Sequence, residues 1–177
     1  DYLIKKKEKI DFCIVGEPTN PKKLGQMIKI GRRGSLSCKI EIIGVQGHVA
    51  YPHLSNNPIN TLIAICKNLK KKPLDKGNKH FQPSNLEFTG IYVDNKAHNV
   101  IPAKVKTQFN IRYNNFHTAK SLKKKLISKI KSICKMNKVK YKLQFISSGD
   151  SFLTAPGQTI LMARKIIKNI TKINPVF

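Results

Sequence analysis

The chain has 177 residues and a formal net charge of +25, from 34 lysine and arginine residues against nine aspartate and glutamate residues. This length accommodates one domain with a hydrophobic core and short parts of a second domain. No segment approaches the roughly 18 consecutive apolar residues of a membrane-spanning helix, so we expect a soluble protein without a membrane partner. The lysine-rich start is not followed by the apolar stretch of a secretory signal.

The excess of positive charge makes nucleic-acid binding an alternative that must be weighed. Only four of the basic residues are arginines, and the lysines are spread over nearly every segment. Arginine, with its planar fork of donors, is the residue favoured for phosphate and base recognition. The pattern indicates compositional drift toward lysine, and we do not expect nucleic acid as a partner.

The four cysteines are far apart in the sequence and form no C-x-x-C pair, which excludes a zinc ribbon. Three of them fall at apolar periodic positions. Buried free thiols in a reducing cytoplasm are therefore the expected state, and we expect a cytoplasmic protein. The cysteines are Cys13, Cys38, Cys66 and Cys134.

The first part of the chain predicts three strands. An uninterrupted apolar run at residues 9–15 is typical of a strand buried on both faces of a parallel sheet. The turn after it, G-E-P-T, places Glu17 at the carboxyl end of that strand, where open α/β sheets bind their ligands. Two more strands are expected at residues 24–31 and 35–43, and the second has one apolar and one mostly polar face.

A helix is predicted after residue 57. Asn57 can cap it, and Pro58 suits the first helical position, where a missing N–H costs nothing. Lysines crowd its last turn and Pro73 ends it. Its predicted apolar stripe, at helical spacing, consists of Ile59, Leu62, Ile63, Cys66 and Leu69.

From residue 35 to residue 147 the predicted order is strand, helix, strand, strand, helix, strand. This order predicts an α+β fold, the ferredoxin-like βαββαβ two-layer sandwich, in which two helices cover one face of an antiparallel four-stranded sheet. A further helix is expected from about residue 157 to 169. The elements predicted between them are strands at 86–93, 103–113 and 138–147 and a helix at 118–136.

A basic ferredoxin-like domain is also typical of RNA-recognition modules, which stack bases on aromatic residues of the open sheet face. In the strand at 103–113, the aromatic residues Phe109 and Tyr113 share the face that we expect beneath the helices. The opposite face of that strand offers no ring. RNA binding is therefore the less favoured hypothesis.

Between the first strand of this sheet and its helix, residues 44–53 read G-V-Q-G-H-V-A-Y-P-H. Two glycines and a proline impose an irregular backbone, which presents side chains rather than burying them. A histidine beside a glycine is often a loop residue without a task. This stretch, however, resembles the G-x-x-x-H-x-A-x-P-H segment of co-catalytic zinc amidohydrolases of the aminoacylase and carboxypeptidase-G type. With N-P at residues 57–58, it is most similar to the succinyl-diaminopimelate desuccinylase family.

Other motifs occur in the order that this family has, so the resemblance covers nearly the whole chain. They are G-E-P-T at residues 16–19, G-R-R-G-S at 31–35, H-N-V-I-P at 98–102, F-N-I-R-Y at 109–113 and S-F-L-T at 151–154. One departure is clear, because the family usually has asparagine where this chain has His98.

The resemblance implies roles for six residues. It makes Glu17 a terminal ligand of one of two zinc ions, although a glutamate in a turn can also simply accept N–H bonds. It implies that His48 donates a hydrogen bond to the oxyanion in the active site of the partner subunit. The substrate-binding set that it implies is Arg32, Tyr51, Asn99 and Arg112, in which the arginines suit carboxylates. Alternatively, Arg112 is only a solvated strand residue. Arg33 is interpreted as a surface neighbour of Arg32.

A two-zinc site of this family needs an H-x-D ligand pair, an adjacent Glu-Glu pair and a late histidine, and the sequence contains neither pair. The glycine-rich substrate loop expected after residue 177 is absent as well. We therefore expect an internal fragment that is inactive alone. Its predicted parts are the end of a catalytic α/β domain at 1–32, a dimerisation and lid domain at 33–148, and a helix returning into the catalytic domain at 149–177.

The function that the resemblance implies is hydrolysis of N-succinyl-L,L-diaminopimelate to succinate and L,L-diaminopimelate in lysine biosynthesis. The complete enzyme would hold two zinc ions, with cobalt as an alternative, and the expected partners are a second copy and a small-molecule substrate. A related amidohydrolase with another N-acyl substrate and a non-catalytic module that forms dimers through an edge strand remain open.

Overall fold

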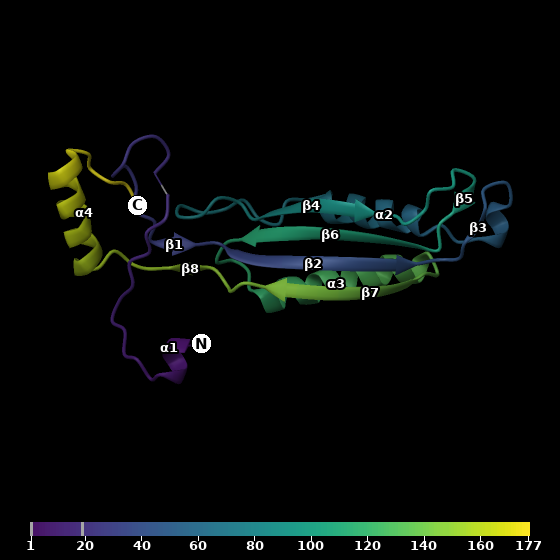
Figure 1. Cartoon of the computed structure of the whole chain (residues 1–177), viewed down its shortest axis with the longest axis horizontal. Helices are drawn as coiled ribbons and strands as arrows, with labels where there is room; N and C mark the ends of the chain where they lie inside the picture. Colours follow the sequence, from purple (N-terminus) through teal and green to yellow (C-terminus); the bar gives the residue numbers. More distant parts are fainter. Residues whose placement is uncertain (1, 19) are drawn as a thin grey trace. The chain divides into compact units, whose positions relative to one another are not determined.

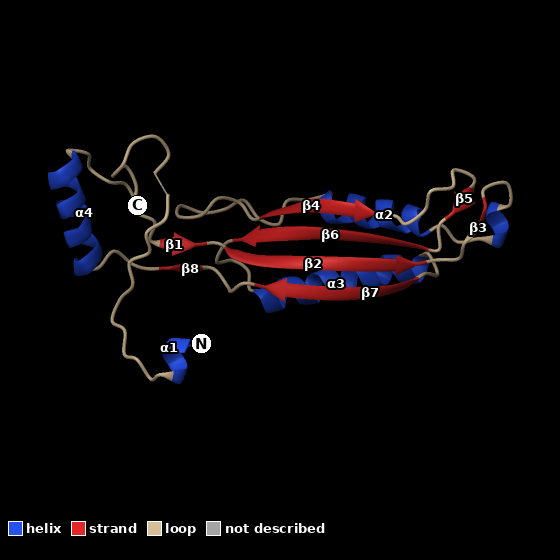
Figure 2. Cartoon of the chain, viewed as in Figure 1, coloured by secondary structure: helices blue, strands red, loops and turns tan. Residues whose placement is uncertain are grey.

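The computed structural model describes residues 2–18 and 20–177. The chain divides into two compact units, one formed by Asp1–Ile30 with Ala155–Phe177 and the other by Gly31–Thr154. The second unit contains a four-stranded sheet with two helices on one face (Figures 1 and 2). Among the described residues, every helix is too short or too polar to cross a membrane.

The four-stranded sheet has the order β4-β6-β2-β7, and each neighbouring pair is antiparallel. With helix α2 between β2 and β4, and α3 between β6 and β7, this is the ferredoxin-like arrangement, so the predicted fold class is confirmed. The strands are β2 (Gly34–Ile43), β4 (Asn85–Tyr92), β6 (Lys104–Tyr113) and β7 (Lys140–Ser147).

The core lies between the sheet and the helices α2 (Pro58–Lys70) and α3 (Ala119–Met136). The central strands β2 and β6 pair over ten residues, and alternate side chains of both point into the core. On β6 these are the residues predicted to share a face, and each is at most 3% exposed: Val105, Thr107, Phe109, Ile111 and Tyr113.

The helix α2 starts as predicted, since the Asn57 side chain accepts a hydrogen bond from the Ile59 N–H and Pro58 occupies the first turn. Its predicted stripe is partly wrong. Ile63 is 59% exposed, whereas Ile65, which the stripe omitted, is fully buried. The helix carries more apolar residues than one stripe needs, so packing against the sheet, and not spacing alone, decides which of them face inward.

Short strands extend the unit at both ends of the sheet. At one end β1 (Gly31–Arg32) pairs with β8 (Phe152–Leu153), where the chain enters and leaves the unit. At the other end β3 (Gly47–His48) pairs with β5 (Val100–Ile101), and a 3-10 turn at Pro52–Leu54 follows.

The first unit corrects two predictions. The segment 9–15 forms no strand, and its apolar side chains are exposed, Ile14 to 77%. A strand buried on both faces needs hydrogen-bonded neighbours, and no described strand pairs with this segment. The strand expected at 24–31 is reduced to a single bridge between Met27 and Val176, followed by β1. The helices of this unit are α1 (Tyr2–Lys5) and α4 (Gln158–Thr171).

A partly buried carboxylate orders the connection between α2 and β4. One Asp75 oxygen accepts hydrogen bonds from the Gly77 N–H at 2.8 Å and the Asn114 amide at 2.7 Å, and the other lies 2.9 Å from the His117 ring. Burial alone would raise the pKa of Asp75, but hydrogen bonds, of which those from Ser84 and Gly77 are the largest, outweigh it and lower the pKa well below its ordinary value.

Because the folded state lowers the pKa of Asp75, the resulting stabilisation is present above the unfolded pKa of about 3.9 and is lost as the pH falls below it. We expect Asp75→Asn to lower the free energy of unfolding by about 2 kcal/mol at pH 7, with a smaller difference from the parent at pH 3. Urea unfolding at pH 7, 5 and 3 measures this. Asp11→Asn, at an exposed carboxylate, is the control and should change stability by less than about 0.5 kcal/mol.

Candidate functional site

The loop that carries His48 leaves the end of β2 through a tight turn. A Cβ on Gly44 would overlap the carbonyl oxygen of Asn56, so this position requires glycine. Val45 and Asn56 exchange two backbone hydrogen bonds of 2.9 Å, which close the base of the loop. The Asn56 side chain donates to the Asn137 carbonyl oxygen at 2.9 Å and so attaches this base to the end of α3.

The structure brings His48, Tyr51 and Asn99 together. His48 pairs with Val100 across β3 and β5, and the Val49 N–H donates to the Asn99 carbonyl oxygen at 3.0 Å. The Asn99 side-chain amide lies 3.4 Å from His48 Nε2, and the Tyr51 ring centroid is 6.0 Å from that of His48. All three residues are exposed, which suits groups that meet a ligand or a partner.

The backbone determines which nitrogen of His48 can donate. The Ala50 N–H donates to His48 Nδ1 at 3.1 Å, so Nδ1 acts as an acceptor and the proton of the neutral ring belongs on Nε2. Nε2 then presents its N–H toward Asn99, whose side-chain oxygen can accept it after rotation of the amide. A neutral His48 is thus prepared to donate a hydrogen bond from Nε2.

Two contributors to this loop were missed by the sequence analysis. Asn95 accepts a hydrogen bond from the Ala97 N–H and donates to the Val100 carbonyl oxygen at 2.7 Å, which shapes the approach to Asn99. The D-N-K-A segment is a typical turn with an asparagine side chain bonded two residues ahead, and that signal could have identified Asn95. No sequence signal marks the Ala50 N–H.

The other two members of the predicted substrate-binding set lie at the opposite end of the sheet. Arg32 is in β1 and donates from Nη2 to the Ser148 carbonyl oxygen at 3.1 Å. Arg112 is exposed on β6, with Ser35 and Asn85 as its neighbours across the sheet. Arg33 is more than a surface neighbour of Arg32, since it donates to the Asn85 side chain at 3.0 Å.

The ten residues of β2 separate the two groups, which corresponds to about 33 Å at the usual rise of a strand. His48, Tyr51 and Asn99 therefore cannot act on the same small ligand as Arg32 and Arg112 of one copy. The structure thus places the predicted substrate-binding residues at two ends of the sheet, and their role in binding a substrate stays a prediction.

Glu17 is exposed and lies in irregular backbone, so the predicted position at the carboxyl end of a strand is wrong: residues 9–15 form no strand that could precede it. Among the residues that the structure describes, no three histidine, cysteine, aspartate or glutamate side chains gather where they could hold a metal ion. One carboxylate does not fit a centre of two zinc ions, so these residues alone do not provide the metal site that the resemblance implies.

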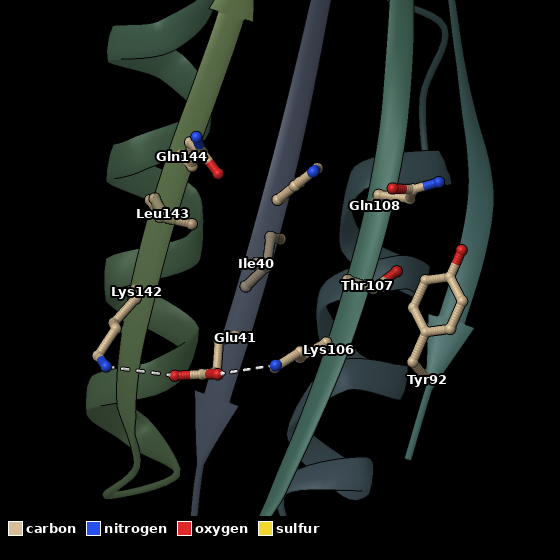
Figure 3. A pocket seen from close by; sticks show the side chains of 10 residues that line it. Ile40, Glu41, Tyr92, Lys106, Thr107, Gln108, Lys142, Leu143 and Gln144 are labelled. Carbon is tan, nitrogen blue, oxygen red and sulfur yellow. Dashed lines mark ion pairs between the residues drawn. The ribbon is translucent and has the colours of Figure 1, made fainter. Parts of the chain in front are cut away.

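A shallow hollow of about 520 Å³ lies on the open face of the sheet and contains none of the predicted residues (Figure 3). The Glu41 carboxylate oxygens lie 3.6 Å from Lys106 Nζ and 3.4 Å from Lys142 Nζ. Tyr92 lies at the edge of the hollow. These exposed lysines neutralise the glutamate, and the pairing holds neighbouring strands together only weakly. The aromatic residues of β6, in contrast, are buried beneath the helices.

The chain belongs to the peptidase dimerisation domain family, whose model matches residues 30–137. It is 56% identical over 175 residues to a succinyl-diaminopimelate desuccinylase of Pelagibacter ubique, covering 99% of this chain and 46% of that protein. A desuccinylase of Paracoccus denitrificans is 43% identical over 176 residues, again with 46% of its length covered. These relatives confirm the resemblance found from the motifs, and the chain spans about half of their length.

The aminopeptidase PepT from Bacillus cereus shares the fold, with a TM-score of 0.67 over 89% of this chain and 40% of that one. Its sequence is only 13% identical, so it supports the fold alone. The family and the fold agree with the ferredoxin-like plan derived above.

The close contact at Gly44 yields a prediction for the His48 loop. We expect Gly44→Ala to displace the Asn56 carbonyl, to lower stability by about 1–3 kcal/mol and to shift the amide resonances of residues 45–51. Two-dimensional NMR with urea unfolding measures both effects. Gly157→Ala is the matched control, because nothing lies within 4 Å of a Cβ at that position. Unchanged loop resonances in Gly44→Ala would contradict the proposed turn.

Proposed function

We propose that this chain is the lid and dimerisation part of a succinyl-diaminopimelate desuccinylase, which hydrolyses N-succinyl-L,L-diaminopimelate to succinate and L,L-diaminopimelate for lysine synthesis in the cytoplasm. The high identity to relatives with that name supports the assignment. By this proposal, residues 33–148 form the lid domain, and the polypeptide alone does not catalyse the reaction.

The observation that carries the proposal is the separation of two residue clusters at opposite ends of one sheet, next to an apolar edge. A second copy must supply the missing cluster if both clusters serve one substrate. A twofold dimer provides this when the two sheets meet edge to edge, because such pairing is self-complementary.

The two edges of the sheet differ in chemistry. Edge strand β7 presents Lys140 and Lys142, and exposed lysines are a common protection against pairing with another strand. Edge strand β4 ends with Ile91 and Tyr92, which are 58% and 56% exposed. Helix α2, on the same side of the unit, adds exposed Ile63 (Figure 1). We therefore assign self-association to β4 and α2.

Antiparallel pairing of β4 with its counterpart reverses the direction of the second sheet. In one copy Asn85 lies across from Arg112 and Tyr92 across from Lys106, so β4 runs from the arginine end toward the His48 end. In the dimer, the His48 end of each copy then lies on the side of the arginine end of its partner. This geometry supports action of His48 in the partner's active site.

In the proposed reaction, water adds to the succinyl amide carbonyl, the C–N bond breaks, and the amine leaves with a proton. His48 Nε2–H would donate to the carbonyl oxygen as it gains negative charge, a contribution of about 3 kcal/mol for one donor. Arg32 and Arg112 would bind substrate carboxylates through their paired donors. Tyr51 and Asn99 would contact the substrate beside His48.

Two zinc ions, or cobalt, belong to the proposed complete enzyme, with Glu17 as one ligand. The described residues do not fit a two-metal centre by themselves, so the remaining ligands would come from other parts of the protein. A dimer-forming module without catalysis is the second candidate. An amidohydrolase with a different N-acyl substrate is the third candidate.

Substitutions at the two edges test the dimer. We expect Ile63→Lys combined with Ile91→Lys to weaken self-association at least about tenfold, because buried apolar residues near the centre of an interface contribute most of its affinity. Ile146→Lys, at a 52% exposed isoleucine of the β7 edge strand, should leave it unchanged. Sedimentation equilibrium gives the dissociation constants. The opposite ranking would assign the dimer to β7.

Mixed dimers test action in trans. The active protein for this test is the Pelagibacter relative with its matching segment replaced by this chain. His48→Ala and Arg112→Ala should each lower turnover of succinyl-diaminopimelate about 100-fold or more. Equal mixing of the two variants after subunit exchange should restore about a quarter of the parent activity, because half of the dimers are mixed and each has one intact site. No recovery despite exchange would mean that both residues act within one copy.

A further inference from the structure

The connection between α2 and β4, residues 74–84, is more ordered than a simple surface loop requires. Asp75 accepts hydrogen bonds from the Gly77 and Ser84 N–H groups of this connection. Gly77 adopts a positive φ of 74°, and Asn78 accepts hydrogen bonds from the His80 and Phe81 N–H groups. The Asn78 amide also donates to the Asn115 side chain at 2.8 Å. This construction fixes a surface on which Lys76, Lys79 and His80 are exposed, and their side chains form no hydrogen bond or ion pair within residues 31–154.

The position of this loop follows from the strand that it precedes. It joins β4 at Asn85, the arginine end of the sheet, whereas residues 93–98 leave β4 after Tyr92, at the His48 end. Within one copy the eight residues of β4 separate the two segments by about 27 Å. Antiparallel pairing of two β4 strands about their centre places residues 93–98 of one copy beside residues 76–80 of the other.

Residues 76–80 carry Lys76 and Lys79, and residues 93–98 carry Asp94 beside Lys96, so the one carboxylate of the second segment has basic partners available in the first. Four of the five carboxylates within Gly31–Thr154, a range that the structure describes completely, have a hydrogen-bonding or ionic partner: Glu41, Asp75, Glu87 and Asp150. The fifth, Asp94, is exposed and forms no ion pair or hydrogen bond within this range. An unpaired carboxylate is notable in a chain with 34 basic residues, because lysines are available on nearly every surface.

We propose that residues 76–80 are a docking surface for residues 93–98 of a second copy, with Asp94 received by Lys76 and Lys79. The docked segment is followed directly by Asn99, which lies beside His48, and by β5, which pairs with β3, so this contact orients the histidine loop that is presented to the partner. The proposal rests on the β4 dimer described above and adds to it a specific contact.

Charge exchange tests the contact. Asp94→Asn should raise the dimer dissociation constant about two- to fivefold, as expected for an exposed ion pair. Asp94→Lys should weaken association further, and adding Lys76→Glu with Lys79→Glu should restore it. Asp11→Asn removes the same charge from the other unit and should have no effect. Failure of the exchanged variant to recover, with a folded chain by circular dichroism, would overturn the proposal.

Cross-linking separates this proposal from the dimer itself. A lysine-reactive reagent with a short spacer should link Lys76 or Lys79 to Lys96, a pair too distant within one copy, and Lys76→Arg with Lys79→Arg should abolish the product. Mixed isotope-labelled chains establish that the link joins two copies. A dimer by sedimentation without this link overturns the docking surface only. A chain that stays monomeric overturns the β4 dimer and the docking surface together.

Discussion

The pairing of β2 with β6 over ten residues is the constraint on which the unit depends. Its alternation places Leu36, Ile40 and Phe109 against two helices and leaves polar residues on the open face. A shift by one residue would exchange the two faces, so the buried side fixes the register. The same length keeps the His48 loop and the two arginines apart. The stability of the unit and the separation of these residues therefore have one cause.

Much of the fold could be predicted because the alternation is regular where one face is buried. The strand from Lys104 to Tyr113 has its predicted face in the core, and helix α2 begins at its predicted cap. Where several apolar residues compete for one face, spacing does not decide, as Ile63 and Ile65 illustrate. The run at residues 9–15 has the composition of a buried strand, but composition supplies no pairing partners.

The candidate site, like the fold, could be predicted from the sequence only in part. The glycines and proline around His48 predicted an exposed, shaped loop, and Asn99 lies beside His48 although fifty-one residues separate them. Motif order alone does not reveal that Arg32 and Arg112 lie at the far end of the sheet. The predicted strand at residues 35–43, which begins after Arg32 and ends before His48, could have revealed it. Hydrogen bonds donated by the backbone, such as that from the Ala50 N–H to His48 Nδ1, could not be predicted, because every residue except proline has the same N–H group.

The contrast between the two sheet edges connects fold and function. Lysines on β7 oppose pairing, while the end of β4 exposes Ile91 and Tyr92, apolar side chains that a partner strand would cover. If association uses β4, the reversal of strand direction brings each histidine loop toward the arginines of the other copy without any change of backbone. The edge chemistry would then complete the site, since the separation imposed within one copy is the separation that a twofold axis removes between two copies.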